Sequence, residues 1–156
     1  MMKRVWYHDS PVGKLGIVEE DDKLTHVFFD NENKAGDAIE EKGAIIEETI
    51  KQLDEYFAKK RKVFDIPMKF SGTPFQVADW EALYKIKYGE TCSYQDIAVA
   101  INSPKAVRAV GMANHNNPIA IIVPCHRVIG KNGKLVGYGG GLDRKIFLLN
   151  LEAGNK

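Results

Sequence analysis

The sequence predicts an α+β protein, with a small sheet-and-helix domain over residues 1–70 and a mainly helical domain over residues 71–156. Two observations lead to this prediction. Short runs of alternating apolar and polar residues, separated by turn residues, fill the first thirty positions and are typical of β-strands. After residue 71, helix-capping signals recur along the chain. The run "SGTP" at residues 71–74 lies between the two patterns, and we take it as the domain boundary.

The first domain has the pattern of a β-meander followed by one helix. Strands are expected at "RVWYHDS", "KLGIVEE" and "KLTHVFFD", because the intervening "PVG" and "DD" favour tight turns. Residues 31–43 are polar and are expected to form an irregular connection. Apolar residues at helical spacing predict an amphipathic helix over residues 44–59, packed on the sheet. A last short strand is expected at "KVFDIPM".

The second domain begins with three predicted helices. Thr73 and Gln76 form a capping box with proline at the first helical position, and Gly89 is expected to end that helix. Ser93 caps a second helix, "YQDIAVAI", and "NS" links it to a third helix that opens at Pro104 and runs "PKAVRAVGMAN". Two short helices on a tight turn have the outline of a helix-turn-helix, although many helical hairpins bind no DNA.

The net charge of +1 conceals an uneven distribution along the chain. Residues 91–156 contain eight Lys/Arg and three Asp/Glu, a net charge of +5, so the other residues carry −4. This segregation suggests an anionic partner for the C-terminal half, with scattered solvated lysines as the competing explanation. The longest apolar run, residues 118–124, is too short to cross a bilayer, and the first ten residues lack a signal peptide's apolar stretch. We therefore expect no membrane association and a cytoplasmic location.

One of the two cysteines, Cys125, precedes His126 at the end of an apolar run in "NPIAIIVPCHRVIGK". A buried structural thiol is the commoner fate of such a pair. A nucleophilic thiol needs a base or a positive environment, because its ordinary pKa of about 8.5 leaves little thiolate at neutral pH. His126, Arg127 and Glu152 are the candidates to provide one. The cysteines and nearby histidines lack zinc-ligand spacing, so we expect two free thiols and no metal.

The run "RAVGMANHNNPIAIIVPCHRVIGKNGKLVGYGGGLDRKIFLLNLE" resembles the signature of the O6-alkylguanine-DNA alkyltransferases, whose active site is a Pro-Cys-His-Arg motif. The resemblance extends from about Thr73 to Glu152, includes "YGETCSYQDIA", and is closest to the compact microbial form. It implies a ribonuclease H-like fold for the N-terminal domain. It also implies direct-reversal DNA repair: a single transfer of an alkyl group from O6-alkylguanine, and from O4-alkylthymine, to the protein's own cysteine after base flipping.

The resemblance also implies roles for individual residues in catalysis. Cys125 would accept the alkyl group, His126 would take the thiol proton through a water, and Glu152 would orient His126. Tyr94 would help guanine to leave, and Asn117 would brace the turn before the active-site segment. No metal or organic cofactor is implied.

The implied partner is double-stranded DNA containing O6-alkylguanine, bound by a monomer. Arg108 would enter the base stack at the position of the extruded nucleotide. The other implied DNA-binding residues are Lys105, Ala106, Asn114 and Tyr94. Contacts to the extruded guanine are implied for Val128, Tyr138, Gly139 and Gly140. Asn114, His115 and Gly139 depart from other members of the family.

Three other classes of protein are open at this point. The first is a catalytically silent protein that senses alkylguanine, but such relatives have another residue at the cysteine position. The second is a cysteine hydrolase or acyl transferase, whose acyl-enzyme would turn over. The third is a plain helix-turn-helix regulator, for which Cys125 would be dispensable. Intact mass after incubation with alkylated DNA separates these classes from a self-alkylating protein.

Overall fold

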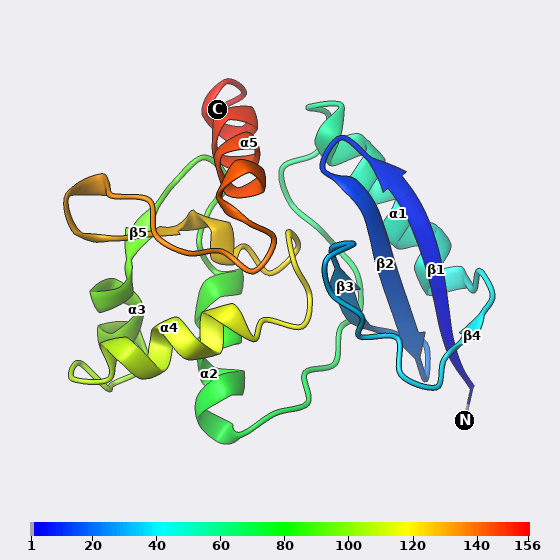
Figure 1. Ribbon diagram of the computed structural model, residues 1–156, viewed down its shortest axis with the longest axis horizontal. Helices are drawn as coiled ribbons and strands as arrows, with labels where there is room; N and C mark the ends of the chain where they lie inside the picture. The colour runs from blue at the N-terminus through cyan, green and yellow to red at the C-terminus, as the bar shows by residue number, and fades with distance from the viewer. Residues whose placement is uncertain (1) are drawn as a thin grey trace. The chain divides into compact units, whose positions relative to one another are not determined.

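The computed structural model describes residues 2–156, which divide into two compact units (Figure 1). Unit 1 contains the chain up to Phe70 together with Pro118–Ala120, and unit 2 contains Ser71–Asn117 and Ile121–Lys156. The short segment Pro118–Ala120 joins unit 1 because its backbone pairs with Val27 through two hydrogen bonds of 2.9 Å. Within residues 2–156, no helix is long and apolar enough to cross a membrane.

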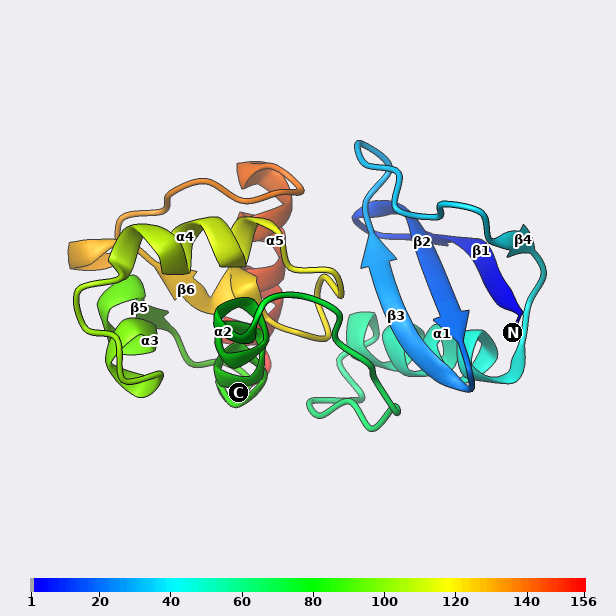
Figure 2. The same ribbon diagram turned by 90° about the horizontal axis from the view of Figure 1, so that it is seen from below.

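Unit 1 is a four-stranded sheet with one helix along one face, as Figure 2 shows. Its elements are β1 (Lys3–Ser10), β2 (Gly13–Glu20), β3 (Lys23–Phe28), β4 (Ile39–Glu40) and α1 (Ala44–Phe57). The strand order is β3-β2-β1-β4; the first three strands form an antiparallel meander and β4 runs parallel to β1. The meander and the amphipathic helix therefore form as the sequence predicts.

Two parts of unit 1 differ from the prediction. The polar connection over residues 31–43 contains β4, because a backbone can pair at a sheet edge without an apolar pattern. The expected strand at residues 62–68 is only a single bridge between Met68 and Leu24. The Gln52 side chain bonds both backbone groups of Asp65, at 2.8 Å and 3.0 Å, so those groups do not pair with a strand.

Helix α1 receives its N-terminal cap from a distant strand. Gly43 occupies the N-cap position and has no side chain, while the carboxylate of Glu19 on β2 accepts a hydrogen bond from Ile46 N–H at 2.9 Å. Glu19 is buried and lies 3.5 Å from the Arg4 guanidinium. A Cβ at Gly43 would overlap the Glu19 carboxylate, which explains the glycine. An acid at a helix N-terminus is favourable because unpaired N–H groups point toward it.

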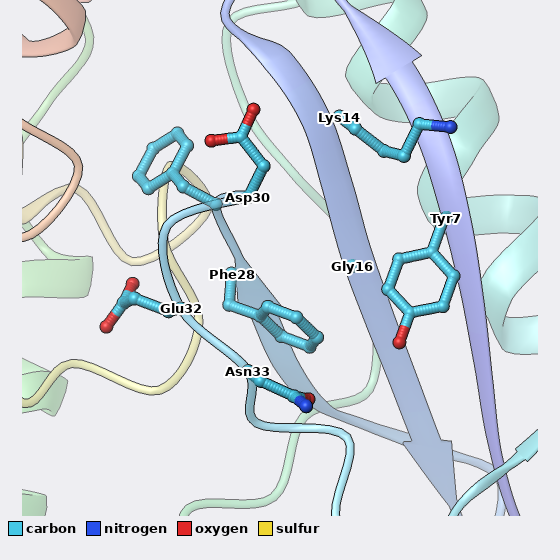
Figure 3. A pocket seen from close by; sticks show the side chains of 8 residues that line it. Tyr7, Lys14, Gly16, Phe28, Asp30, Glu32 and Asn33 are labelled. Carbon is cyan, nitrogen blue, oxygen red and sulfur yellow. The ribbon is translucent and has the colours of Figure 1, made fainter.

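The face of the sheet away from α1 has a hollow of about 310 Å³ (Figure 3). The Phe28 ring lies across Gly16, where a Cβ would overlap it, and Tyr7 packs edge-on against that ring with centroids 6.3 Å apart. Asp30, Glu32 and Asn33 line the hollow from the loop after β3. The glycine on β2 is thus required by close packing of an aromatic ring.

Unit 2 combines helices with a two-stranded parallel sheet. Its elements are α2 (Pro74–Tyr84), β5 (Cys92–Ser93), α3 (Tyr94–Ala100), α4 (Val107–His115), a 3₁₀ turn at Cys125–Arg127, β6 (Val128–Ile129), a second such turn at Lys131–Gly133, and α5 (Leu142–Ala153). Helices α2, α3 and α4 pack on one another, and β5 pairs with β6. The α3-turn-α4 pair is the expected helix-turn-helix.

The helix starts follow the predicted caps, with two corrections at other boundaries. Capping boxes form at Thr73 and at Ser93, as expected. Helix α2 ends at Tyr84, before Gly89, because its last N–H groups bond three residues back and tighten the turn. Helix α4 begins at Val107, after Pro104, because residues 103–106 form a turn closed by Ala106 N–H donating to Ser103 O at 2.9 Å.

Replacing Glu19 by alanine should destabilise unit 1 by about 1–3 kcal/mol, the cost of leaving a buried donor unpaired. The amide of Ile46 should then exchange with solvent faster in hydrogen-exchange measurements. Glu20→Ala, on the neighbouring position of the same strand, is the matched control and should leave that amide protected. Equal protection of Ile46 in wild type and Glu19→Ala would contradict the capping role.

Candidate active site

The segment that carries Cys125 is buried and has a strained backbone. Ile121, Ile122 and Val123 are each at most 3% exposed, and Ile121 has a φ of +71°. A β-branched residue in the left-handed region costs roughly 1–3 kcal/mol, which the surrounding packing must offset. The 3₁₀ turn that follows leaves Cys125 half-buried. This arrangement fixes the backbone on which the thiol is placed.

Asn117 connects the end of α4 to this segment. Its side-chain Nδ2 donates to Val123 O at 2.8 Å and to the sulfur of Cys125 at 3.2 Å. Asn117 is only 5% exposed, and its backbone N–H bonds Asn114 O at 3.1 Å. The amide therefore braces the turn and also gives the sulfur a hydrogen-bond donor, which favours a thiolate.

A buried three-residue network lies next to the thiol. His126 Nε2 lies 2.7 Å from Glu152 Oε2, and the Arg127 guanidinium donates to both Glu152 oxygens at 2.8 Å and 3.0 Å. Arg127 also donates to Ile86 O at 2.6 Å, and Glu152 Oε1 accepts from Gly89 N–H at 3.3 Å. His126 and Glu152 are at most 1% exposed. One buried carboxylate is thus paired with one permanent cation and one imidazole.

Burial and the charges of this network act together on the protonation states of Glu152 and His126. Burial alone raises the pKa of Glu152, but the hydrogen bonds and charges of His126 and Arg127 outweigh it and hold that pKa well below its usual range. Burial lowers the pKa of His126, although Glu152 opposes this effect. A neutral His126 must carry its proton on Nε2, because Glu152 only accepts. Its Nδ1 has no hydrogen-bond partner among residues 2–156 and is available to take a proton.

Lys145 is a buried cation close to the active-site segment, and its residue type alone predicts no more than a contribution to the net charge. It is 1% exposed, and its ammonium donates to Val128 O at 2.7 Å and to Val136 O at 3.2 Å. Burial lowers the pKa of Lys145, and the charge of Cys125 acts in the opposite direction. The spacing of Lys145 with Leu148 and Glu152 on one face of α5 was the available signal for burial.

The two thiols of the chain have different surroundings. Burial, together with the charge of Asp96, raises the pKa of Cys92 to about 11, so this thiol is protonated at neutral pH. Cys125 instead has the Asn117 amide at its sulfur and the Lys145 cation within electrostatic range. Burial, and then the charge of Cys125, raise the pKa of Tyr94, so its hydroxyl keeps its proton at neutral pH. Cys125 is the thiol with the positive environment that a nucleophile requires.

The residues expected to contact guanine lie on β6 and in the loop before α5, and Lys145 bonds Val128 O among them. Val128 is buried on β6. Tyr138 and Gly139 are half-buried and Gly140 is buried in the loop that leads into α5. Tyr138 O accepts from Gly141 N–H at 2.8 Å, and Gly140 O accepts from Arg144 at 3.2 Å. The loop backbone is therefore held by hydrogen bonds beside the active-site segment.

Helix α4 presents some of the expected DNA-binding residues to solvent. Lys105, just before α4, and Arg108, within it, are exposed, and Ala106 is half-buried. Asn114 differs from these residues: it is 7% exposed, with its carboxamide against the carboxylate of Asp79 on α2. Asn114 thus links α4 to α2, and its expected contact with DNA stays a prediction. Within the described residues, no group of His, Cys, Asp and Glu could hold a metal ion.

A helix-turn-helix unit that also holds a cysteine beside a buried His-Glu-Arg network is the arrangement expected of a DNA-binding protein that uses a thiol. Comparison with known proteins gives the particular family. Residues 74–154 match the 6-O-methylguanine DNA methyltransferase DNA binding domain, and residues 3–70 match its ribonuclease-like domain. The chain belongs to the 6-O-methylguanine DNA methyltransferase family, whose fold agrees with the α+β class predicted from the sequence.

Individual relatives agree with this assignment. The constitutive methylated-DNA–protein-cysteine methyltransferase of Bacillus subtilis is 48% identical, covering 92% of each chain. The methyltransferase of Methanosarcina barkeri is 48% identical, covering 94% of this chain and 95% of its own. The crystal structure of Mycobacterium tuberculosis OGT in complex with DNA superposes with a TM-score of 0.93 at 45% identity, covering 97% of this chain and 94% of that one. The protein therefore performs direct-reversal DNA repair by methyl transfer to a cysteine and binds DNA.

Replacing Glu152 by glutamine should slow transfer at neutral pH with little change in DNA affinity, because a neutral amide no longer supports His126 by charge. The measurement is the single-turnover rate on duplex DNA containing O6-methylguanine. Asp143→Asn removes an exposed carboxylate from the same helix and is the matched control. An unchanged rate in Glu152→Gln would contradict the orienting role.

The same variant should show a pH-dependent loss of stability. The folded pKa of Glu152 lies below its ordinary value of 4.5, so its carboxylate stabilises the fold fully above that pH, and the contribution is lost as pH falls through the folded pKa. The difference in unfolding free energy between wild type and Glu152→Gln should be largest near pH 7 and shrink in acid. A difference that stays constant down to pH ~3 would contradict this linkage.

Proposed function

We propose that Cys125 is the cysteine that accepts the alkyl group from O6-alkylguanine, and from O4-alkylthymine, in double-stranded DNA. The observation that carries the proposal is the Asn117 amide, 3.2 Å from the Cys125 sulfur, together with the buried His126-Glu152 pair beside it. A cysteine is the expected acceptor, because nucleophilic attack on the saturated alkyl carbon favours a polarisable thiolate. Cys92, whose raised pKa keeps it protonated, is the alternative acceptor.

The reaction is balanced by two proton movements. The thiol proton passes through a water to Nδ1 of His126, while Nε2 donates to Glu152 and holds the ring. The sulfur then forms a bond to the alkyl carbon as the bond from that carbon to the guanine oxygen breaks. The electron pair of the broken bond stays on the guanine, and Tyr94 supplies a proton to it. The product thioether has no easy exit, so each molecule acts once.

The cation of Lys145 supports the thiolate and the guanine site together. Its charge stabilises the negative sulfur of Cys125, and its hydrogen bonds to Val128 O and Val136 O hold the segments that contact the base. The carbonyls of Cys125 and Val128 accept from the guanine amino group. A carbonyl oxygen has two lone pairs, so Val128 O can serve Lys145 and guanine at once. The amides of Gly139 and Gly140, after Tyr138, close over the base.

Helix α4 provides the means to reach a base that is stacked inside the duplex. Extruding a nucleotide costs a few kcal/mol, and the exposed Arg108 enters the stack in its place. Lys105 and the backbone near Ala106 contact phosphate groups. The Mycobacterium tuberculosis relative in complex with DNA supports a DNA partner. We further propose that the protein acts as a monomer in the cytoplasm and needs no cofactor.

Intact mass of the protein, before and after incubation with duplex DNA containing O6-methylguanine, tests the acceptor. We expect an increase of one methyl group, located on Cys125 by peptide mapping. Cys125→Ser should abolish the increase, because a serine hydroxyl with no strong base is neutral and a hard nucleophile. Cys92→Ser is the matched control and should be methylated like wild type. A methyl group on Cys92, or none at all, would overturn the proposal.

Replacing Arg108 by alanine separates base extrusion from phosphate binding. If Arg108 fills the vacated stack, the rate at saturating duplex falls, and the defect shrinks with single-stranded DNA or free O6-benzylguanine, where nothing is flipped. We expect this outcome. A simple phosphate contact would instead weaken binding to every duplex and lower the salt slope by about one, leaving the saturated rate intact.

If Arg108→Ala lowers the transfer rate equally on duplex DNA, single-stranded DNA and the free base, then Arg108 supports the fold or the nucleophile. Lys105→Ala serves as the comparison for a phosphate contact, because Lys105 is exposed close to Arg108 on the chain. It should lower affinity and the salt slope without changing the saturated rate.

A further inference from the structure

Two adjacent residues of α2 hold the C-terminal end of α4. Trp80 is 3% exposed, and its indole N–H donates to Ala113 O at 2.9 Å. The preceding residue, Asp79, is fully buried and faces the side chain of Asn114. In the carboxamide orientation that satisfies both groups, the Asn114 nitrogen lies 2.6 Å and 3.1 Å from the two Asp79 oxygens and 3.1 Å from Val110 O. The last turn of α4 is thus bonded to α2 through both backbone and side chain.

A carboxylate is a costly choice for this position. Burial raises the pKa of Asp79 to about 7, which means that the charged form is destabilised there. An apolar side chain would fill the same space without that cost, as the neighbouring buried residues Trp80 and Leu83 do. What an apolar side chain cannot do is accept hydrogen bonds from Asn114. The retained acid therefore points to a directional requirement on α4.

The Asp79-Asn114 pair lies where the two functions of unit 2 meet. Arg108 lies on α4, less than two turns before Asn114. In the other direction, Asn114 O accepts from Asn117 N–H at 3.1 Å, and the Asn117 amide bonds the Cys125 sulfur at 3.2 Å. A rotation or shift at the end of α4 would therefore change the position of Arg108 relative to the thiol.

We propose that Asp79 is a positioning residue, which through Asn114 fixes α4 so that a nucleotide extruded by Arg108 arrives at Cys125. This inference rests on the proposed function of Cys125 and Arg108. Asp79 touches neither DNA nor the reacting atoms in this scheme. The pair is needed when the substrate must be delivered from a duplex. It is dispensable when a free base diffuses into the site, because Asn117 is held independently by Val123 O.

The test compares two substrates in the same variants: a duplex containing O6-methylguanine at saturating concentration, and free O6-benzylguanine. Asp79→Leu keeps a similar volume and removes both acceptors. It should lower the single-turnover rate on the duplex about tenfold or more, since small misplacements of reacting groups carry losses of that order. The rate with the free base should change much less. Glu81→Gln removes an exposed carboxylate from the same helix, and its ratio of the two rates should equal that of wild type.

Exchanging the two side chains separates a positioning role from a general loss of folding. Asn114→Asp alone places two carboxyl groups about 3 Å apart, so they must share a proton or repel each other, and the loss of the amide donors should lower the duplex rate. Adding Asp79→Asn restores one acid and one amide with their positions exchanged, so the ratio of duplex to free-base rates should return toward wild type. Thermal unfolding of each variant is recorded alongside.

The outcomes are distinct. A purely structural role predicts that both rates fall together with the unfolding temperature, and a duplex-to-free-base ratio unchanged in Asp79→Leu overturns the inference. Failure of the exchanged pair to recover that ratio also overturns it. If wild type transfers no group from either substrate to Cys125, the proposed function fails, which is a different result from a working wild type with an insensitive Asp79.

Discussion

The active site depends on one buried carboxylate. Glu152 is the shared acceptor for His126 and Arg127, and its negative charge is what allows a guanidinium and an imidazole to lie in the interior together. It joins α5 to the 3₁₀ turn that begins with Cys125, and through Gly89 N–H to the chain after α2. The two Glu152 oxygens therefore orient the imidazole, balance the charge of the site and join three segments of the chain.

The two thiols differ in how readily they ionise, because their surroundings differ. Cys92 lies on a short strand beside Asp96, where burial and a negative neighbour both oppose ionisation. Cys125 lies at a turn where Asn117 donates to its sulfur and Lys145 provides a buried positive charge. Stabilising a thiolate requires donors and cations at fixed positions, so the fold must hold the turn rigidly. The left-handed backbone upstream of the turn is consistent with that requirement.

The sequence by itself determined the local elements and the family. Thr73 and Ser93 cap their helices because a side chain reaches a backbone N–H only three residues away, so the signal is contained in four consecutive letters. The meander and the amphipathic α1 follow from periodicity for the same reason. The run around Cys125 carried the family resemblance, and with it the expectation that His126 and Glu152 lie together, which the structure shows.

Only the tertiary structure decided which polar side chains replace regular backbone pairing and which charges are buried. Gln52 bonds the backbone where a strand was expected, and Glu19 caps a helix that begins 25 residues later. Lysine and asparagine side chains usually face solvent, yet Lys145 and Asn114 are both buried against partners distant in the chain. The spacing of Lys145 on α5 signals burial, but no local pattern identifies the partner of either residue, because each contact is defined by the packing of two elements.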